Sequence, residues 1–261
     1  MKAGESQMVM EVDGKQYHVR LGKGDVGRYV LLPGDPGRCE YIAKYLDDAK
    51  FVSSNREYVT YTGSLDGVPV SVTSTGIGCP SAAIAVEELY RCGADTFVRV
   101  GTSGHIQKDL KSGELAIISA AIRDEGTTKH YLPIEFPAVA DLDVTRALQI
   151  AAKREGAPHR TGISQSKDSF YGQHEPERMG VADELLSRWR AWELGGALCS
   201  EMEAAGIYIV ASMLKARAGG IAMVHAKDPM PPLDSLLKVA VEGVRELIKM
   251  DREAGREVFV R

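Results

Sequence analysis

The side chains best suited to chemistry lie in residues 97–104, where Phe-Val-Arg-Val is followed by Gly-Thr-Ser-Gly. Arg99 stands inside an apolar β-branched run, and Thr102 and Ser103 follow at its end. A buried strand has no structural need for an arginine, because burying an unpaired guanidinium is costly. A strand that ends at an anion site does need one, so we expect these three residues to meet a phosphate. The alternative is a strand arginine paired with a carboxylate, followed by an ordinary turn.

A second candidate anion site follows residues 28–32, an apolar run that Pro33, Gly34 and Asp35 interrupt. Helical periodicity then runs from residue 38 to 46. A strand that breaks at glycine before a helix directs backbone N–H groups at the space above the sheet, and Arg38 on the first helical turn points the same way. The alternative is a plain connection with a solvent-facing arginine.

Residues 74–81, Ser-Thr-Gly-Ile-Gly-Cys-Pro-Ser, form another glycine-rich turn before a helix. The turn lacks the third glycine of a dinucleotide fingerprint and the Gly-Lys-Ser/Thr of a nucleotide-binding P-loop. Pro80 suits the first position of the following helix. This turn therefore predicts no dinucleotide or Walker-type site.

The elements that must position these residues alternate between strands and helices. Strands are expected at 28–32, 56–62, 68–73, 97–104, 113–119, 161–166 and 221–224, and helices at 38–46, 82–90, 143–154, 177–194, 200–214 and 233–250. This alternation predicts an α/β fold of three layers, in one domain that covers residues 1–261. Carboxylates at the start of the 200–214 segment suit a helix dipole.

Composition excludes several classes of protein. The net charge of −4 and a pI near 5.9 argue against a nucleic-acid binder. The N-terminal residues carry charges throughout, and no run approaches the ~20 apolar residues of a membrane span. Cys39, Cys79, Cys92 and Cys199 form no C-x-x-C pair and are expected to be reduced thiols. We therefore expect a cytoplasmic enzyme with no membrane and no nucleic-acid partner.

Together, the motifs resemble one family. The sequence resembles the nucleoside phosphorylases of the trimeric and hexameric type, most closely the bacterial uridine phosphorylases, from about His18 to the terminal helix. The segments that carry the resemblance are 33–38, 56–57, 74–81, 99–104, 135–141, 168–171 and 200–205. The resemblance implies a twisted mixed β-sheet flanked by helices. It also implies phosphorolysis, with inorganic phosphate as co-substrate and no organic cofactor.

By this resemblance, phosphate is held within one subunit by Gly34, Arg38, Arg99 and Thr102, and Arg56 reaches in from the neighbouring subunit. Arginine suits a phosphate because its planar fork meets two oxygens at once. Each site thus needs a second copy of the chain, and the family analogy implies a hexamer of three dimers.

The resemblance also implies a nucleoside site in which Glu203 accepts the ribose hydroxyl protons, with His18 coming from the partner chain. Arg99, Glu203 and Arg38 are the residues expected to carry catalysis. Phe170 is similar to an aromatic residue that packs against the base; the alternative is a core phenylalanine. The residues expected at the nucleoside are His18, Thr102, Ser103, Phe170, Gln173, Arg178, Glu201, Met202 and Glu203.

Base recognition departs from the family pattern in two places. Gln173 matches a glutamine that reads the uracil edge, but the arginine expected two residues later is Glu175. Either Arg178 replaces it through a shifted loop, or the edge is read differently. After the last strand, residues 225–229 are His-Ala-Lys-Asp-Pro in place of an asparagine–arginine pair, and Asp228 resembles the aspartate of purine-specific relatives.

Several functions therefore stay open. The preferred one is phosphorolysis of uridine to uracil and ribose 1-phosphate, and the alternative enzyme is a purine nucleoside phosphorylase. A hydrolase-like member of the fold would have no use for Arg38, Arg56 and Arg99, and a non-catalytic nucleoside-binding protein is a further possibility.

The resemblance also implies a cation site. Glu57, Ile77 and Ser81 match positions that hold a monovalent cation such as K⁺ at the dimer interface of the family's uridine phosphorylases; the alternative is a local ion pair of Glu57. No His/Cys cluster has the spacing of a transition-metal site.

Overall fold

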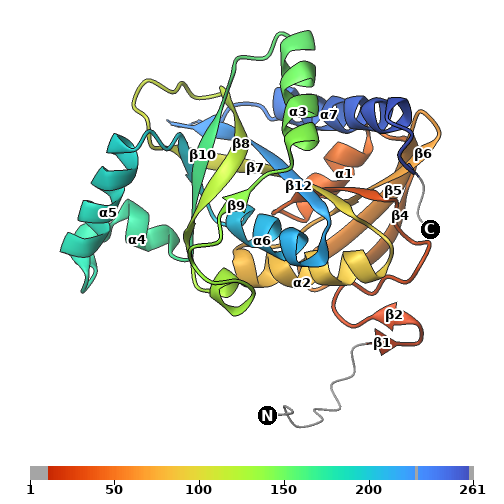
Figure 1. Cartoon of the computed structure of the whole chain (residues 1–261), viewed down its shortest axis with the longest axis horizontal. Coiled ribbons are helices and arrows are strands. Elements are labelled where there is room, and N and C mark those ends of the chain that lie inside the picture. The colour runs from red at the N-terminus through yellow and green to blue at the C-terminus, as the bar shows by residue number, and fades with distance from the viewer. Residues whose placement is uncertain (1–10, 227–228, 259–261) are drawn as a thin grey trace.

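The computed structural model describes residues 11–226 and 229–258, which are built around a ten-stranded sheet (Figure 1). A small hairpin of β1 (Glu11–Val12) and β2 (Lys15–Gln16) precedes this sheet. The sheet strands, in spatial order, are β11 (Cys199–Glu201), β10 (His159–Lys167), β8 (Leu115–Asp124), β12 (Arg217–His225), β7 (Thr96–His105), β3 (Tyr29–Pro33), β6 (Val68–Thr73), β5 (Tyr58–Leu65) and β4 (Asp47–Asn55), with β9 (Ala138–Val139) paired to β8.

One part of the sheet closes on itself. β11 pairs with β10 in parallel and with the end of β7 in antiparallel orientation, so that β7, β12, β8, β10 and β11 form a ring. Ser200 of β11 lies opposite Gly104 of β7, and Ser166 of β10 lies opposite Glu201. This closure brings together pairs of strand residues that lie 96 and 35 positions apart in the sequence. The active-site candidates lie at this point.

Helices cover both faces of the sheet. α1 (Gly37–Ala43), α3 (Leu142–Arg154) and α7 (Asp234–Glu253) lie on one face, and α2 (Cys79–Arg91) and α6 (Ala204–Leu214) lie on the other (Figure 1). Each helical layer packs its own apolar core against the sheet. The predicted three-layer α/β fold with a twisted mixed sheet is confirmed. The short α4 (Phe170–His174) and the exposed α5 (Ala182–Leu194) project at one end, and two 3₁₀ turns, η1 (Thr127–His130) and η2 (Pro176–Arg178), complete the elements.

The elements β4, α5 and α6 differ from the predictions. β4 was not predicted, because its sequence Asp-Asp-Ala-Lys-Phe-Val-Ser-Ser-Asn is polar and forms the sheet edge. The predicted helix at 177–194 begins only at Ala182, after η2. The predicted helix at 200–214 begins at Ala204, because Ser200 and Glu201 belong to β11. Glu201 still serves the helix, since its Oε2 accepts the N–H groups of Glu203 and Ala204 at 2.8 Å each.

Helix α7 is tied to the sheet by the fully buried carboxylate of Asp251. Tyr29 donates its hydroxyl to Asp251 at 2.6 Å, and Arg217 donates from both terminal nitrogens at 2.9 and 2.6 Å. Burial alone would raise the pKa of Asp251, but the hydrogen bonds from Arg217 and Tyr29 outweigh it and hold the pKa below its usual value. The stabilisation is therefore complete above about pH 4 and is lost as the pH falls through the lowered pKa.

We expect Asp251→Ala to lower the free energy of unfolding by about 3–5 kcal/mol, because it leaves Arg217 charged and unpaired beneath α7. Urea unfolding at pH 7 measures this loss. Asp66→Ala is the matched control, since Asp66 pairs with Arg245 at the surface and an exposed pair contributes at most about 1 kcal/mol. Equal losses in the two variants would contradict the role given to Asp251.

Candidate active site

A cleft of about 490 Å³ opens where β3, β7, β11 and β12 end and α4 begins. It collects most of the residues predicted from the sequence, although they come from five separate segments of the chain. The predicted residues that line it are Gly34, Arg38, Ile77, Arg99, Thr102, Ser103, Phe170, Glu201, Met202 and Glu203.

Arg99 is the central charge of the cleft and is only 4% exposed. Its Nε donates to Glu201 Oε2 at 2.7 Å, and its Nη2 pairs with Glu203. Burial alone would lower the pKa of Arg99, but Glu203 and Glu201 outweigh it and keep the guanidinium charged. Gly101 is required beside it, because a Cβ there would lie 2.8 Å from Nη2. Arg99 therefore has the carboxylate partner that the alternative prediction required, and it has two of them, Glu201 and Glu203.

One nitrogen of Arg99 remains for a ligand. Within residues 11–226 and 229–258, Nη1 is buried and has no hydrogen-bond partner. A Cβ at Gly34 would lie 4.0 Å from this nitrogen and 3.3 Å from the carbonyl oxygen of Gly76, so the backbone at Gly34 leaves the nitrogen open. An unpaired buried donor is costly unless a ligand satisfies it. The carboxylate interpretation of Arg99 accounts for two of its N–H directions, and the third is left unpaired beside the cleft among the described residues.

A second cation faces the same end of the cleft. Arg38, on the first turn of α1, is mostly buried, and its nearest carboxylate is Asp35 at 3.8 Å. Burial lowers the pKa of Arg38, and the nearby charge of Arg99 acts in the same direction. Two arginines brought together at a mostly buried site repel each other, and a dianion between them relieves that repulsion.

Glu203 and Glu201 have different surroundings. Glu203 Oε1 accepts the N–H of Gly78 at 2.6 Å and Oε2 meets Arg99, which leaves a further lone pair on each oxygen toward the cleft. Burial raises the pKa of Glu203, while Arg99 opposes that shift. Glu201 is surrounded by protein donors, from Arg99 and the helix N–H groups on one oxygen and from Ser164 and Ser166 on the other. Glu201 therefore holds Arg99 in place, whereas Glu203 keeps acceptor capacity at the wall of the cleft.

The opposite end of the cleft is aromatic and polar. The Phe170 side chain is 52% exposed, so it forms a wall of the cleft rather than part of the core. The centroid of its ring lies 4.2 Å from that of the His174 ring. Ser200 Oγ lies 2.7 Å from Gln173 Oε1 and 2.5 Å from Gln165 Oε1. A hydroxyl has a single proton, so one of these two amides turns its NH₂ group toward Ser200. Gln173 lies behind Gly104, where a Cβ would stand 3.6 Å from its amide nitrogen, and it lines the neighbouring pocket beside α5 rather than the cleft itself.

Several predicted residues lie elsewhere in this chain. The ring of His18 is held by Glu88 at 2.6 Å, and Arg56 stands on the exposed turn between β4 and β5; neither lines the cleft of its own chain. Arg178 pairs with Glu175 and lies over the ring of Tyr171, outside the cleft, so the structure does not bring it to the base end. Asp228 falls outside the described residues.

The positions suggested for a cation lie next to one another. Ser81 Oγ donates to Glu57 Oε1 at 3.1 Å, and a Cβ at Gly76 would lie 2.7 Å from the Glu57 side chain. Ile77, the next residue, is exposed at the rim of the cleft. Among residues 11–226 and 229–258 there is no group of three His, Cys, Asp or Glu side chains that would hold a metal ion.

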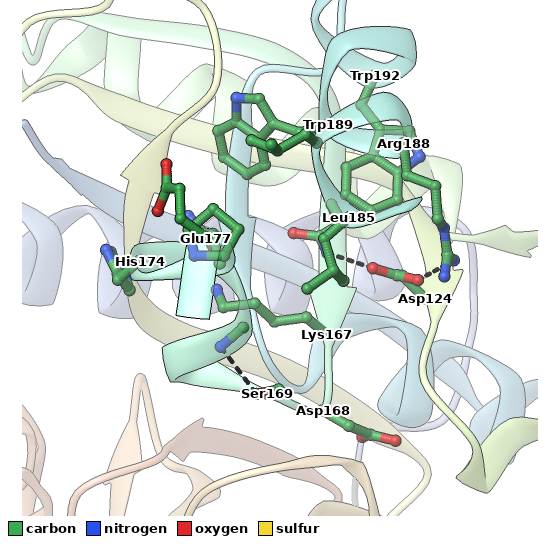
Figure 2. A pocket seen from close by; sticks show the side chains of 15 residues that line it. Asp124, Lys167, Asp168, Ser169, His174, Glu177, Leu185, Arg188, Trp189 and Trp192 are labelled. Carbon is green, nitrogen blue, oxygen red and sulfur yellow. Dashed lines mark hydrogen bonds and ion pairs between the residues drawn. The ribbon is translucent and has the colours of Figure 1, made fainter. Parts of the chain in front are cut away.

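Sequence reasoning missed Lys167, Ser200 and His174, which also line the cleft, as does His225 of the 225–229 segment. Lys167 closes β10 directly before the 168–171 motif, and a lysine at the carboxyl end of a parallel strand is the signal that was available. It also lines a neighbouring pocket of about 420 Å³ beside α5, shown in Figure 2, where its side chain runs between Ser169 and Leu185. The sequence predicted a helix over 200–214, so it did not indicate that Ser200 lies on strand β11 and lines the cleft.

Comparison with known proteins agrees with this geometry. The family model described as "Phosphorylase superfamily" matches residues 28–250. The chain belongs to the phosphorylase superfamily. It is therefore a phosphorylase by family.

Three relatives place it more closely within this superfamily. The chain is 47% identical to a uridine phosphorylase of Treponema pallidum over 246 residues, which are 90% of this chain and 95% of that protein. It is 45% identical to a uridine phosphorylase of Thermococcus kodakarensis, covering 95% of this chain and 93% of the relative. It is also 41% identical to a guanosine phosphorylase of Halorubrum lacusprofundi, covering 80% and 83%. None of the helices in the described ranges is both long and apolar enough to span a membrane.

Proposed function

We propose that this protein catalyses the reversible phosphorolysis of uridine to uracil and ribose 1-phosphate. The observation that carries the proposal is the Arg99 guanidinium, which pairs with the Glu203 carboxylate on one side and on the other has a buried Nη1 with no partner among the described residues. One rigid group thereby sets the distance between an anion and a sugar. The uridine phosphorylases of Treponema pallidum and Thermococcus kodakarensis support uridine as the substrate.

Phosphate binds in this mechanism at the end of the cleft that holds Gly34, Arg38 and Arg99, with Thr102 between phosphate and ribose. Arg99 Nη1 donates to one phosphate oxygen, and Arg38 supplies the second cation. No organic cofactor takes part. Holding the dianion against the sugar replaces an encounter in solution by a fixed geometry.

The sugar lies over Glu203 and Met202, with Ser103 beside it. Glu203 accepts protons of the ribose hydroxyls, and Met202 offers an adaptable apolar wall. The bond from C1′ to the base nitrogen breaks with its electron pair going to the base, and a phosphate oxygen forms the new bond to C1′. The phosphate charge stabilises the cationic sugar between these two events.

Phosphorolysis of a purine nucleoside is the second candidate. The relative from Halorubrum lacusprofundi, named for guanosine, favours it, and it covers most of this chain. The base end of the cleft differs from both expected patterns, because Arg178 lies outside it. The phosphate and sugar residues serve both candidates equally, so the choice rests on the base.

A single assay separates these functions. We expect the purified protein to release uracil from uridine at a rate that rises with phosphate, to form ribose 1-phosphate, and to act on guanosine and inosine more slowly. Chromatography of the bases, with and without phosphate, measures this. A preference for guanosine or inosine would establish the purine alternative, release that ignores phosphate would establish a hydrolase, and binding without turnover would leave a nucleoside-binding protein.

The active enzyme is proposed to be a homo-oligomer, a hexamer of three dimers. Support comes from His18 and Arg56, which do not line the cleft of their own chain and would complete a neighbouring one. A sedimentation mass of one chain in a fully active sample would contradict this.

A monovalent cation, K⁺ in particular, is proposed at Glu57, Ser81 and Ile77 at the interface of each dimer. The pairing of Glu57 with Ser81 gathers oxygen atoms of the kind that hard cations prefer. The alternative is the local hydrogen bond alone. An unchanged thermal midpoint on replacing K⁺ by tetramethylammonium would favour that alternative.

The whole chain, residues 1–261, is proposed to be a single domain that works in the cytoplasm, in nucleoside catabolism and pyrimidine salvage. The ten-stranded sheet that runs through the described residues supports the single domain. All four cysteines are free and buried, which suits a reducing compartment. Fractionation of cells with an antibody against the protein tests the location.

A further inference from the structure

Lys167 is a buried cation whose charge no carboxylate neutralises directly. The residue is 6% exposed, and its Nζ has one hydrogen-bond partner, Ser200 Oγ at 2.7 Å. In the described part of the chain, no carboxylate oxygen lies within 4.0 Å of Nζ. Asp124, the acid on the adjacent strand β8, is occupied by Gln165 at 2.6 Å and by Arg188. Lysine is rarely buried without a partner, so two free N–H directions of Lys167 require an acceptor.

The position of Lys167 determines which part of a nucleoside it can meet. Phosphate and ribose take the end of the cleft that holds Arg99 and Glu203, so the base is left with the end lined by Phe170, Ser200 and Lys167. Figure 2 shows the Lys167 ammonium on the side of the pocket where His174 lies, and His174 and Lys167 are the two residues that line both this pocket and the cleft. The ammonium therefore stands at the boundary between the cleft and the space behind it.

We propose that Lys167 is a catalytic and specificity-determining residue that donates a hydrogen bond from its ammonium to a carbonyl oxygen of the departing base. This inference rests on the proposed phosphorolysis. When the C1′–N bond breaks, its electron pair passes to the base, and the carbonyl oxygens of uracil take up the negative charge. A fixed ammonium in a water-poor site stabilises that charge, and uracil takes a proton from water after release.

The same contact discriminates between bases. An ammonium has donors and no acceptor, so it matches a carbonyl oxygen and opposes an amino group. Uridine fits this arrangement, whereas cytidine presents an amino group at the corresponding edge. Gln173, which shares Ser200 with Lys167, has both a donor and an acceptor and completes the reading of the edge.

The charge of Lys167 is also sensitive to pH. Burial lowers the pKa of Lys167 to about 8, although Glu201, Glu203, Cys199 and Asp124 all act to raise it. His174, which lines the same two spaces, has a lowered pKa as well, first through burial and then through the charge of Lys167. The donor is therefore protonated below pH 8 and lost above it, so the rate constant kcat/KM for uridine falls on the alkaline side.

The test compares the native enzyme with Lys167→Met and Lys167→Arg, and uses Lys153→Met on the exposed surface of α3 as the control. We expect Lys167→Met to lower kcat/KM for uridine about 10²-fold, with the KM for phosphate changed less than threefold. The deficit should be smaller with 5-fluorouridine, because its base is the better leaving group and needs less help. Lys167→Arg should retain part of the activity and move the alkaline fall beyond pH 9, since guanidinium stays protonated.

Two outcomes would overturn the inference. The first is an equal loss for uridine and 5-fluorouridine in Lys167→Met, which would indicate a structural role. The second is an alkaline fall near pH 8 that persists unchanged in Lys167→Arg. Phosphate and uridine titrate identically in the assays of both enzymes, so an unchanged fall would not come from the Lys167 ammonium. If Lys167→Met does not fold, the pH profile of Lys167→Arg decides alone. Failure of the native enzyme to cleave any nucleoside would instead refute the proposed phosphorolysis.

Discussion

Replacing Arg99 by lysine should lower kcat/KM for phosphate by about 10³-fold while the protein remains folded. The guanidinium bonds Glu201 through Nε and Glu203 through Nη2, and in the proposed mechanism Nη1, which is unpaired among the described residues, binds phosphate in the same plane. A lysine keeps one charge near the two glutamates, but a single nitrogen at the end of a flexible stem cannot occupy all three directions. The direction that faces phosphate is the one lost, because the buried carboxylates hold the ammonium.

Arg99→Ala is a poorer probe of the same contact. It leaves Glu201 and Glu203 buried without their cation, a loss that costs about 3–5 kcal/mol of folding free energy and confounds the kinetics. Arg217→Lys is a matched control, since Arg217 is another largely buried arginine that pairs with a carboxylate, on the far side from the cleft. It should reduce stability and leave the KM for phosphate unchanged. A folded Arg99→Lys enzyme with native phosphate dependence would refute the phosphate role of Arg99.

Replacing Glu203 by glutamine should lower kcat/KM for uridine by about 10³-fold and affect the KM for phosphate much less. Both carboxylate oxygens face donors, the Gly78 N–H at 2.6 Å and Arg99 Nη2. An amide has one oxygen, so its NH₂ group must oppose one of these donors and the side chain turns out of place. The acceptor for the ribose hydroxyls is lost together with its orientation.

A substrate series separates these two causes in the Glu203→Gln enzyme. If Glu203 accepts a hydrogen bond from a ribose hydroxyl, the loss of kcat/KM should be clearly smaller with 2′-deoxyuridine or 3′-deoxyuridine than with uridine. The deoxy substrate lacks the hydroxyl, so it makes no such hydrogen bond even in the native enzyme. The same loss with all three nucleosides would contradict a direct contact with the sugar. Because burial raises the pKa of Glu203, the acid side of the uridine profile should fall at a higher pH than an exposed glutamate gives, and this fall should vanish in the variant.

Local pattern was enough to predict the parts of the site that lie on single elements. The apolar run around Arg99 predicted its strand, and the breaks at Gly34 and Gly76 predicted the turns beside it. These signals are local because a strand followed by glycine directs its backbone N–H groups and the next side chains toward one edge of the sheet whatever lies beyond. The alternation of elements likewise predicted the three layers.

The partners of those residues were decided only by the tertiary structure. Whether Arg99 bonds a carboxylate or an anion could not be read from its own segment, because Glu201 at the end of β11 and Glu203 at the start of α6 lie about 100 residues later. The closed ring of strands makes that meeting possible, and ring closure depends on pairing between β11 and β7, for which no short-range pattern exists. Glu201 itself looked like a residue of a helix start until the strand pairing placed it behind Arg99.

The base end of the cleft shows the same limit most clearly. The sequence offered Arg178 as the cation for the base, on the strength of its position after Gln173, yet Glu175 holds it at the surface. Lys167 and Gln173 instead meet at the Ser200 hydroxyl, which comes from a strand about 30 residues later in the sequence. By itself the sequence determined which side chains are available and which elements carry them. The tertiary structure decided which charges are buried without a partner, because burial and pairing belong to the packed chain as a whole.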